Sequence, residues 1–314
     1  MAFESFVKEI AEKTVIILKD QQTNCEVEIY AFGGLLNAFR LPVNKQLFNI
    51  VHGFDSVDDA MANITNGFRS AKLSPFVCRM YKGKYFLDHT AYTIEKHLLS
   101  GHAIHGLLYD AVFEVKETVA DSAKASVTLV YAYNGSLAGY PFPYTMEICW
   151  QLEAANKLTV TTAITNQSAG AIPLADGWHP YFRLGGYVDE WHLQFDGRQQ
   201  FEFDAELIPT GNKTEDPRFT GGASLKGIQL DNSYELLRTT PLPRCILQNE
   251  QLLLVIEPDK SYPVLQVYIP PHRTSIAIEN LSGIPDNFNN HLGLIMLPPG
   301  ETRQFVTSYQ VTNK

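Results

Sequence analysis

Basic residues are few and scattered in this 314-residue sequence. There are 25 Lys and Arg against 34 Asp and Glu, which gives a formal charge of −9 at pH 7. Proteins that bind nucleic acid usually carry a basic patch, and no cluster of Lys or Arg is present here, so we expect no nucleic-acid partner. Long apolar runs are also missing. A membrane-spanning helix needs about 18 consecutive apolar residues, and we therefore expect no membrane association.

Paired cysteines are absent as well. The four cysteines lie far apart and form no C-x-x-C pair: Cys25, Cys78, Cys149 and Cys245. This spacing does not fit a structural zinc site, and a protein of this size does not need a disulfide framework. We expect four reduced thiols in a cytoplasmic protein. The opening stretch "MAFESFVKEIAEK" contains acidic residues and no long apolar run, so we expect no secretory signal peptide.

Several common catalytic motifs are missing. The sequence has no G-x-x-x-x-G-K-[ST] phosphate loop, no G-x-G-x-x-G after a predicted strand and no G-x-S-x-G elbow. Internal repeats, low-complexity linkers and charge runs are not evident either, so we predict one domain over residues 1–314. A hydrophobic content of 45% is sufficient to bury a large core.

Alternation of apolar and polar residues is the dominant pattern. It is clearest in "YTMEICWQLEAANKLTVTTAITNQ", where the apolar face has these members: Met146, Ile148, Trp150, Leu152, Leu158, Val160, Thr162 and Ile164. Polar side chains occupy the other face, and a turn at residues 154–157 separates the two halves. This pattern predicts an antiparallel hairpin with one buried face.

Similar alternation recurs along most of the sequence. It predicts strands in "TVIILKD", "CEVEIYAFGG", "SVTLVYAY", "CILQNEQLLLVIEP", "VLQVYIP", "TSIAIEN" and "RQFVTSYQV", and a hairpin across residues 88–90. Many strands with turns between them indicate an all-β protein, a large antiparallel β-sandwich with few short helices. One such helix is expected at residues 3–10, because Phe3, Phe6, Val7 and Ile10 have helical spacing.

The segment "ADGWHPYFRL" combines His179 with three aromatic residues, Trp178, Tyr181 and Phe182. Pro180 favours an extended backbone at His179. The aromatic rings are suited to form the wall of a pocket that binds a sugar, because sugars stack their C–H faces on such surfaces. The alternative is a buried, hydrogen-bonded histidine with a purely structural role.

His102 and His105 occur in "GHAIHGLLYD". A His-x-x-His pair can bind a metal ion, but this one lies outside any predicted helix and has no third ligand nearby, so we expect no metal site. One imidazole is better suited to donate a hydrogen bond, and the alternative is an ordinary loop histidine.

Three charged residues are further candidates. Arg79 has a planar set of donors that suits vicinal hydroxyls or a carboxylate, although it is equally consistent with a surface arginine. Asp231 could accept hydrogen bonds from hydroxyls, but alone it is typical of a turn. Glu279 ends the apolar strand "TSIAIEN". Burial there would raise its pKa and suit it to act as a base, unless it faces solvent.

Taken in order, these residues resemble the aldose 1-epimerase (galactose mutarotase) family over most of the chain. The most specific segments are "YPFPYTMEICWQL", "KLTVTTAITNQSAGAIPLADGWHPYFRL", "IENLSGIPDNFN" and "LPPGETRQFVTSYQV". The Tyr-Pro-Phe-Pro and Gly-Trp-His-Pro variants resemble a bacterial branch of the family. The resemblance implies the galactose mutarotase-like β-sandwich. It also implies that His179 is the general acid, that Glu279 is the catalytic base, and that Arg79, His105 and Asp231 bind substrate.

The sequence departs from the family pattern at three positions. His102 and Cys78 stand where Asn is common, and Asn280 replaces a frequent Pro after the catalytic Glu. None of these differences removes a catalytic group, so they bear on the identity of the substrate more than on the reaction.

The resemblance implies interconversion of the α and β anomers of a free hexose such as glucose or galactose. Ring opening is acid–base chemistry without a redox change, so we expect no cofactor. His179 would have to start protonated, a state that a nearby carboxylate would favour. Two alternatives remain. One is a hexose-6-phosphate 1-epimerase, for which Arg79 and Arg183 are the available cations, and the other is a non-catalytic carbohydrate-binding protein. The expected assembly is a monomer or a homodimer.

Overall fold

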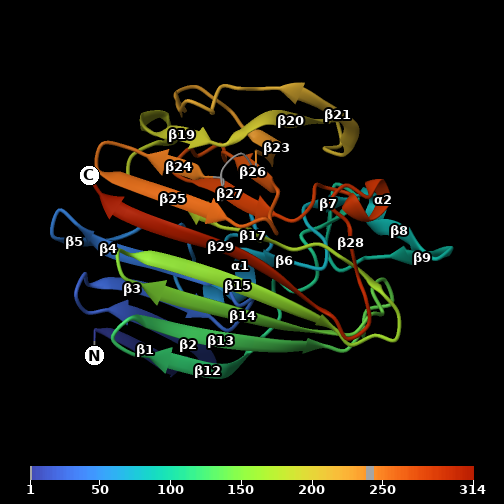
Figure 1. Cartoon of the computed structure of the whole chain (residues 1–314), viewed down its shortest axis with the longest axis horizontal. Coiled ribbons are helices and arrows are strands. Elements are labelled where there is room, and N and C mark those ends of the chain that lie inside the picture. The colour runs from blue at the N-terminus through green and yellow to red at the C-terminus, as the bar shows by residue number, and fades with distance from the viewer. Residues whose placement is uncertain (1, 238–243) are drawn as a thin grey trace.

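Antiparallel strands dominate the structure, as the alternating sequence predicts. The computed structural model of the chain describes residues 2–237 and 244–314. The nine-stranded sheet that faces the viewer in Figure 1 contains the following strands in spatial order: β12 (Glu114–Ala120), β13 (Lys124–Tyr133), β14 (Tyr144–Glu153), β15 (Lys157–Asn166), β29 (Thr302–Asn313), β25 (Leu252–Pro258), β24 (Cys245–Gln248), β19 (His192–Phe195) and β22 (Ala223–Ser224).

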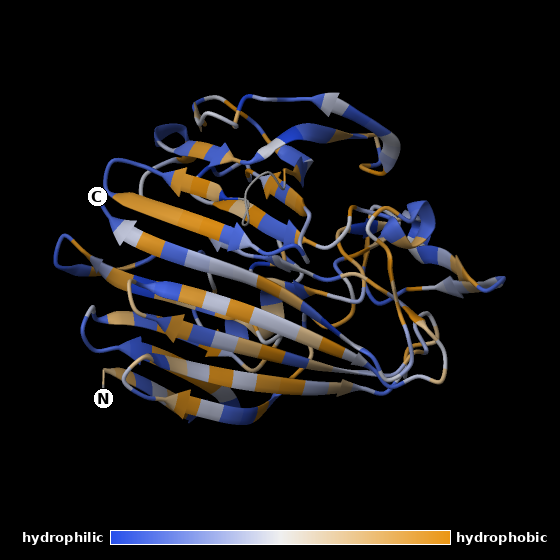
Figure 2. Ribbon diagram, viewed as in Figure 1, coloured by the Kyte–Doolittle hydropathy of each residue, from blue (hydrophilic) through white to orange (hydrophobic). Residues whose placement is uncertain are grey.

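The predicted long hairpin lies at the centre of this sheet and is confirmed. β14 and β15 pair over their full lengths, and buried residues alternate with partly exposed ones along both strands. The orange and pale bands that alternate along these strands in Figure 2 show the same period of two. This alternation gives the sheet one face that packs into the core.

Two further sheets complete the main body. A five-stranded sheet contains β1 (Phe3–Ile10), β2 (Lys13–Asp20), β3 (Cys25–Tyr30), β4 (Leu36–Val43) and β5 (Gln46–Asn49). An eight-stranded sheet contains, in order, β21 (Pro209–Glu215), β20 (Gly197–Phe203), β23 (Asp231–Leu236), β26 (Val264–Tyr268), β27 (Ile276–Leu281), β17 (Gly177–His179) and β6 (Ala71–Leu73), with β18 (Tyr181–Phe182) paired to β27.

The main hydrophobic core joins all three sheets. Ile16 of β2, Ile148 of β14 and Ile278 of β27 belong to one continuous buried cluster, and each is fully shielded from solvent. A second buried cluster includes α1 (Val57–Asn63), whose apolar side chains Val57 and Ala60 pack inward. The large antiparallel β-sandwich with few short helices expected from the sequence is therefore the observed fold.

Several smaller elements complete the fold. A three-stranded sheet contains β10 (Leu98–Leu99), β11 (His102–Ile104) and β7 (Arg79–Met80). Two further pairs are β16 (Ile172–Leu174) with β28 (Ile295–Leu297), and β8 (Lys84–Leu87) with β9 (Thr90–Thr93). The remaining short helices are η1 (Tyr81–Gly83), η2 (Val188–Glu190) and α2 (Asn287–Asn290). No helix in the described part of the chain is long and apolar enough to cross a bilayer.

The expected helix at residues 3–10 is wrong. These residues form β1, which pairs with β2 from Phe3 opposite Asp20 to Ile10 opposite Lys13. Phe6, Val7 and Ile10 are each more than 40% exposed, so their helical spacing marks no buried face. An isolated eight-residue helix is marginal in water, whereas every residue of this segment lies opposite a residue of β2 in the sheet.

Candidate active site

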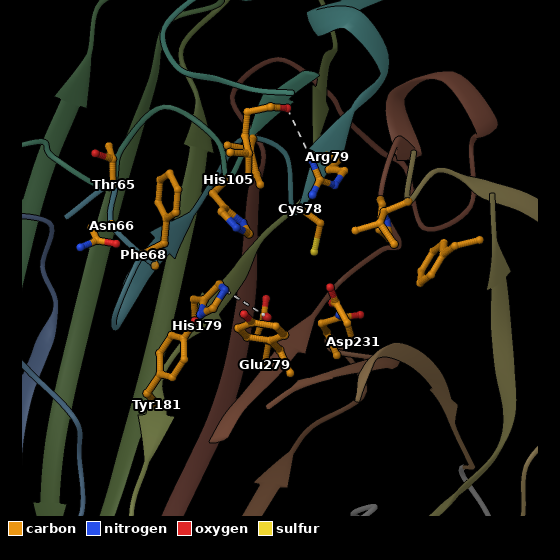
Figure 3. A pocket seen from close by; sticks show the side chains of 18 residues that line it. Thr65, Asn66, Phe68, Cys78, Arg79, His105, His179, Tyr181, Asp231 and Glu279 are labelled. Atoms are coloured by element: carbon orange, nitrogen blue, oxygen red, sulfur yellow. Dashed lines mark hydrogen bonds and ion pairs between the residues drawn. The ribbon is translucent and has the colours of Figure 1, made fainter. Parts of the chain in front are cut away.

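A cavity of about 370 Å³ lies between the eight-stranded sheet and the three-stranded sheet (Figure 3). Its size is within the range of small-molecule sites. All five residues selected from the sequence line it: Arg79, His105, His179, Asp231 and Glu279. These positions span 201 residues of the sequence (279 − 79 + 1). The fold therefore brings together groups that are distant along the chain.

Strand pairing places His179 and Glu279 side by side. β17 lies between β6 and β27, with Trp178 opposite Asn280, and His179 is the last residue of the strand. Pro180 follows and has no N–H to donate to a ladder. The chain then continues as β18 along the same neighbour, with Tyr181 opposite Ala277. This path keeps His179 next to the middle of β27, where Glu279 lies.

His179 Nε2 is 3.2 Å from Glu279 Oε1, and both side chains are buried (Figure 3). Burial lowers the pKa of His179 to about 4. Burial, together with the negative charge of Asp231, raises the pKa of Glu279 well above its usual range. Both shifts favour uncharged side chains. The nearby carboxylate was expected to favour a protonated His179, and burial acts in the opposite direction.

Asp231 and Gln266 extend the polar floor of the cavity. Asp231 begins β23 opposite Tyr268 of β26, and Gln266 of β26 lies opposite Glu279. Gln266 Nε2 donates to Asp231 Oδ1 over 2.8 Å. Removal of the Asp231 carboxyl from bulk water raises its pKa, although Arg79 and the Gln266 hydrogen bond oppose this effect. The adjacent strands β23, β26, β27 and β17 thus present hydrogen-bond donors and acceptors to the same cavity.

His105 and Arg79 face this floor from the three-stranded sheet. Arg79 lies in β7, which pairs with β11, and His105 directly follows β11. The His105 backbone has a φ of 61°, and its N–H donates to Cys78 O over 2.9 Å. Gly106 is required next, because a Cβ atom there would lie 2.3 Å from the carbonyl oxygen of Ser74.

The His105 imidazole is buried against two other rings. Its ring centre is 4.9 Å from that of His179, with the planes perpendicular, and 4.6 Å from that of Phe68. Burial, with the nearby His179 and Arg79, lowers the pKa of His105 well below its usual range. His105 is thus a neutral imidazole that can donate or accept a hydrogen bond.

Only one of the three aromatic neighbours of His179 lines the cavity. Tyr181 does so, with its ring stacked 5.1 Å from that of His179. Trp178 points the other way, because successive side chains of a strand alternate, and it packs against Trp150 in the core. Phe182 is also buried in the core. The sequence suggested that all three aromatic residues form walls of the pocket. Trp178 and Phe182 do not line it.

The other histidine of the His-x-x-His pair has a different environment. His102 does not line the cavity, and its ring contacts the backbone N–H of Lys82 and the carboxylate of Glu206. Among the described residues, no cluster of three or more His, Cys, Asp or Glu side chains has a geometry suited to hold a metal ion. The cavity lining combines titratable side chains with hydrogen-bonding ones.

The sequence matches the profile of the aldose 1-epimerase family over residues 15–310. The chain belongs to the aldose 1-epimerase family. Among curated proteins, it is 27% identical over 237 residues to YihR, an uncharacterized protein of Escherichia coli K12, and the match covers 73% of this chain and 74% of YihR. This level of similarity agrees with common membership of one family.

Solved structures share the fold of this family member. A galactose mutarotase-like protein from Clostridium acetobutylicum superposes with a TM-score of 0.86 at 16% identity, covering 99% of this chain and 98% of that one. A galactose 1-epimerase from Lactobacillus acidophilus NCFM gives a TM-score of 0.82 at 16% identity, with 99% and 98% coverage. At such low identity, these likenesses establish the fold alone.

Several residues that line the cavity of this family member were not among the site residues predicted from the sequence. Asn66, Tyr268 and Gln266 line it, and so does Cys78, which the sequence had shown only as a departure from the family pattern. Gln266 carried a usable signal, because it is a polar residue inside the apolar strand "VLQVY", where a buried amide needs a specific partner. Asn66 lies in an irregular segment whose position depends on the tertiary fold.

Proposed function

We propose that this protein is an aldose 1-epimerase that interconverts the α and β anomers of a free hexose. The observation that carries the proposal is the buried contact between His179 and Glu279, 3.2 Å apart on the floor of a sugar-sized cavity. Membership of the aldose 1-epimerase family and the fold support this reaction class.

The reaction requires an acid and a base that lie close together. Ring opening removes the proton from O1, forms the C1=O1 carbonyl and breaks the bond between C1 and the ring oxygen, which takes up a proton. Both oxygens are bonded to C1, so the two protein groups must be near neighbours. Glu279 is proposed to act as the base at O1 and His179 as the acid at the ring oxygen. Reclosure on the opposite face of the carbonyl reverses both transfers.

A single proton held by the pair would serve these roles. The directions of the two pKa shifts favour its position on Glu279 in the unliganded pocket, and its transfer to His179 would produce the carboxylate and the imidazolium that ring opening uses. Glu279 Oε2 is buried and has no hydrogen-bond partner among the described residues. A sugar hydroxyl that donates to this oxygen would stabilise the ionised carboxylate and so favour the transfer.

Three further residues are proposed to bind the sugar. His105 lies beside His179 and would contact the ring oxygen or a neighbouring hydroxyl, since its Nδ1 is buried without a partner in the described part of the chain. Arg79 and Asp231 present a donor group and an acceptor group to the remaining hydroxyls. Such contacts hold C1 near the acid and the base and increase the rate by orientation.

The charges in the cavity favour an unphosphorylated sugar. Among the described residues that line it, Arg79 is the only Lys or Arg, and it faces two acidic residues, Asp231 and Glu279. Arg183, the other cation considered for a phosphate group, lies at a separate pocket, where its Nε donates to Asn49 O. A hexose 6-phosphate would therefore meet little positive charge.

The test is polarimetry, or NMR exchange spectroscopy, on freshly dissolved α-glucose and α-galactose, with glucose 6-phosphate measured in parallel. We expect faster mutarotation of a free hexose than in buffer, and slower turnover of the phosphate. Glu279→Gln and His179→Asn should each reduce kcat by about 10²- to 10⁴-fold. Sugar binding without rate enhancement would instead indicate a non-catalytic carbohydrate-binding protein.

A further inference from the structure

The tip of the hairpin formed by β20 and β21 closes one side of the cavity. Phe203, the last residue of β20, and Leu207, in the connecting turn, both line it. β21 is the edge strand of its sheet and pairs only with β20. The sheet therefore anchors this apolar wall through β20 alone, and a contact made by the hairpin tip would add a second anchor.

The turn at the tip has a defined conformation of its own. Asp204 Oδ1 accepts hydrogen bonds from the backbone N–H groups of Glu206 and Ile208, over 2.8 and 3.0 Å. The N–H of Leu207 donates to the carbonyl oxygen of Asp204 over 3.1 Å, and Leu207 has a φ of 60°. The turn thus fixes the backbone from which the Glu206 and Leu207 side chains project.

The second anchor is a contact between the side chains of Glu206 and His102 at the cavity rim. Glu206 Oε2 is 3.1 Å from His102 Nε2, and the exposed fractions of the two side chains are 56% and 4%. His102 Nδ1 accepts a hydrogen bond from the backbone N–H of Lys82 over 3.1 Å. This bond leaves the ring proton of a neutral His102 on Nε2, directed at the carboxylate. In this tautomer, His102 donates from Nε2 to the Glu206 carboxylate.

This pair connects the hairpin to the side of the cavity that carries Arg79 and His105. His102 begins β11, which pairs with β7, where Arg79 lies, and it is three residues before His105. We propose that the His102–Glu206 pair is a latch that positions the apolar wall formed by Phe203 and Leu207 against the bound sugar. This proposal rests on the function proposed above. His102 and Glu206 are positioning residues that set sugar affinity, because neither lines the cavity.

The latch should affect binding more than chemistry. His179 and Glu279 belong to the neighbouring strands β17 and β27, which do not pair with the hairpin of β20 and β21, so their contact does not depend on the hairpin tip. Phe203 and Leu207 can offer only an apolar surface, which would cover the C–H face of a sugar ring. A displaced wall would raise KM and leave kcat nearly unchanged.

The experiment compares three variants at sites that are exposed in the folded protein. Glu206→Ala removes the acceptor, Glu206→Gln retains a neutral acceptor, and Glu215→Ala is the matched control on β21, because Glu215 is exposed and has no side-chain hydrogen bond or ion pair in the described structure. Steady-state mutarotation gives KM and kcat, and hydrogen-exchange mass spectrometry reports the opening of residues 203–208.

We expect Glu206→Ala to raise KM by about three- to tenfold, the range that a partly exposed charged hydrogen bond supports. Its kcat should stay within about twofold of the parent value, residues 203–208 should exchange faster, and Glu206→Gln should fall between parent and Ala. Unchanged KM and exchange in Glu206→Ala, or an equal effect of Glu215→Ala, would overturn the latch. If the parent protein has no mutarotase activity, the function proposed above fails, and the exchange experiment alone still decides whether the pair holds the hairpin.

Discussion

Lys72 Nζ lies 2.5 Å from Asp176 Oδ1, and both side chains are completely buried. The ammonium group also donates to the carbonyl oxygen of Gly177 and lies 4.3 Å from the ring centre of Trp178. Tyr262 adds a hydrogen bond to the same carboxylate oxygen over 2.7 Å. This network lies on the core side of β17, the strand that carries His179 toward the cavity.

Removal of the Lys72 charge should destabilise the protein. Lys72→Met leaves Asp176 buried without its cation, and breaking one side of such a pair typically costs about 3–5 kcal/mol. Because burial already raises the pKa of Asp176, protonation of the carboxyl will relieve part of this cost. Urea unfolding at pH 7 measures the loss, and Lys226→Met, at an exposed lysine, is the control. The double variant Lys72→Met, Asp176→Asn should be more stable than Lys72→Met alone. An equal stability of the two would contradict this account.

The sequence predicted those parts of the site that depend on local pattern. His179 was recognisable from its Trp-His-Pro segment, and the buried face of β14 and β15 from strict alternation. The contact between His102 and Glu206 joins residues 104 positions apart (206 − 102). No local pattern encodes such a contact, since it depends on how the hairpin folds over the sheet end.

The side chains around His179 also show what local pattern can and cannot predict. In a strand, alternation places Trp178 and His179 on opposite faces, but the sequence interpretation grouped all the aromatic residues of the segment as pocket walls. The effect of burial on the acid also escaped prediction. The proximity of Glu279 suggested a charged histidine, whereas the observed depth of burial favours the neutral pair.

The burial of His179 should make stability depend on pH. Its pKa is about 4 when folded, against an ordinary value near 6.5. A depressed pKa contributes stability that is complete above about pH 6.5 and is lost as the pH falls toward 4, because only the unfolded state binds the proton there. The difference corresponds to about 3 kcal/mol. Urea unfolding between pH 7 and 4 should therefore show a smaller loss for His179→Asn than for the parent. Parallel curves would argue against a buried neutral His179.

The shared proton predicts a bell-shaped dependence of kcat/KM on pH. As the pH falls to about 4, His179 takes up a second proton, and the pair can no longer supply a base. As the pH rises through the elevated pKa of Glu279, the pair loses its only proton and can no longer supply an acid. Activity should be highest between these limits. Mutarotation rates, corrected for the buffer reaction at each pH, measure both limbs.

Asp231 should control the position of the alkaline limb. Its negative charge is one of the two causes that raise the pKa of Glu279, and burial is the other and larger one. Asp231→Asn removes this charge and should shift the alkaline limb of kcat/KM to lower pH. The acid limb should stay near pH 4, because burial of His179 sets it. Loss of a sugar contact will lower the height of the profile but not reverse the direction of the shift.

Glu215→Gln, at an exposed site on β21, should leave both limbs in place. An alkaline limb that moves upward, or does not move, in Asp231→Asn would show that Glu279 is not the group that titrates there.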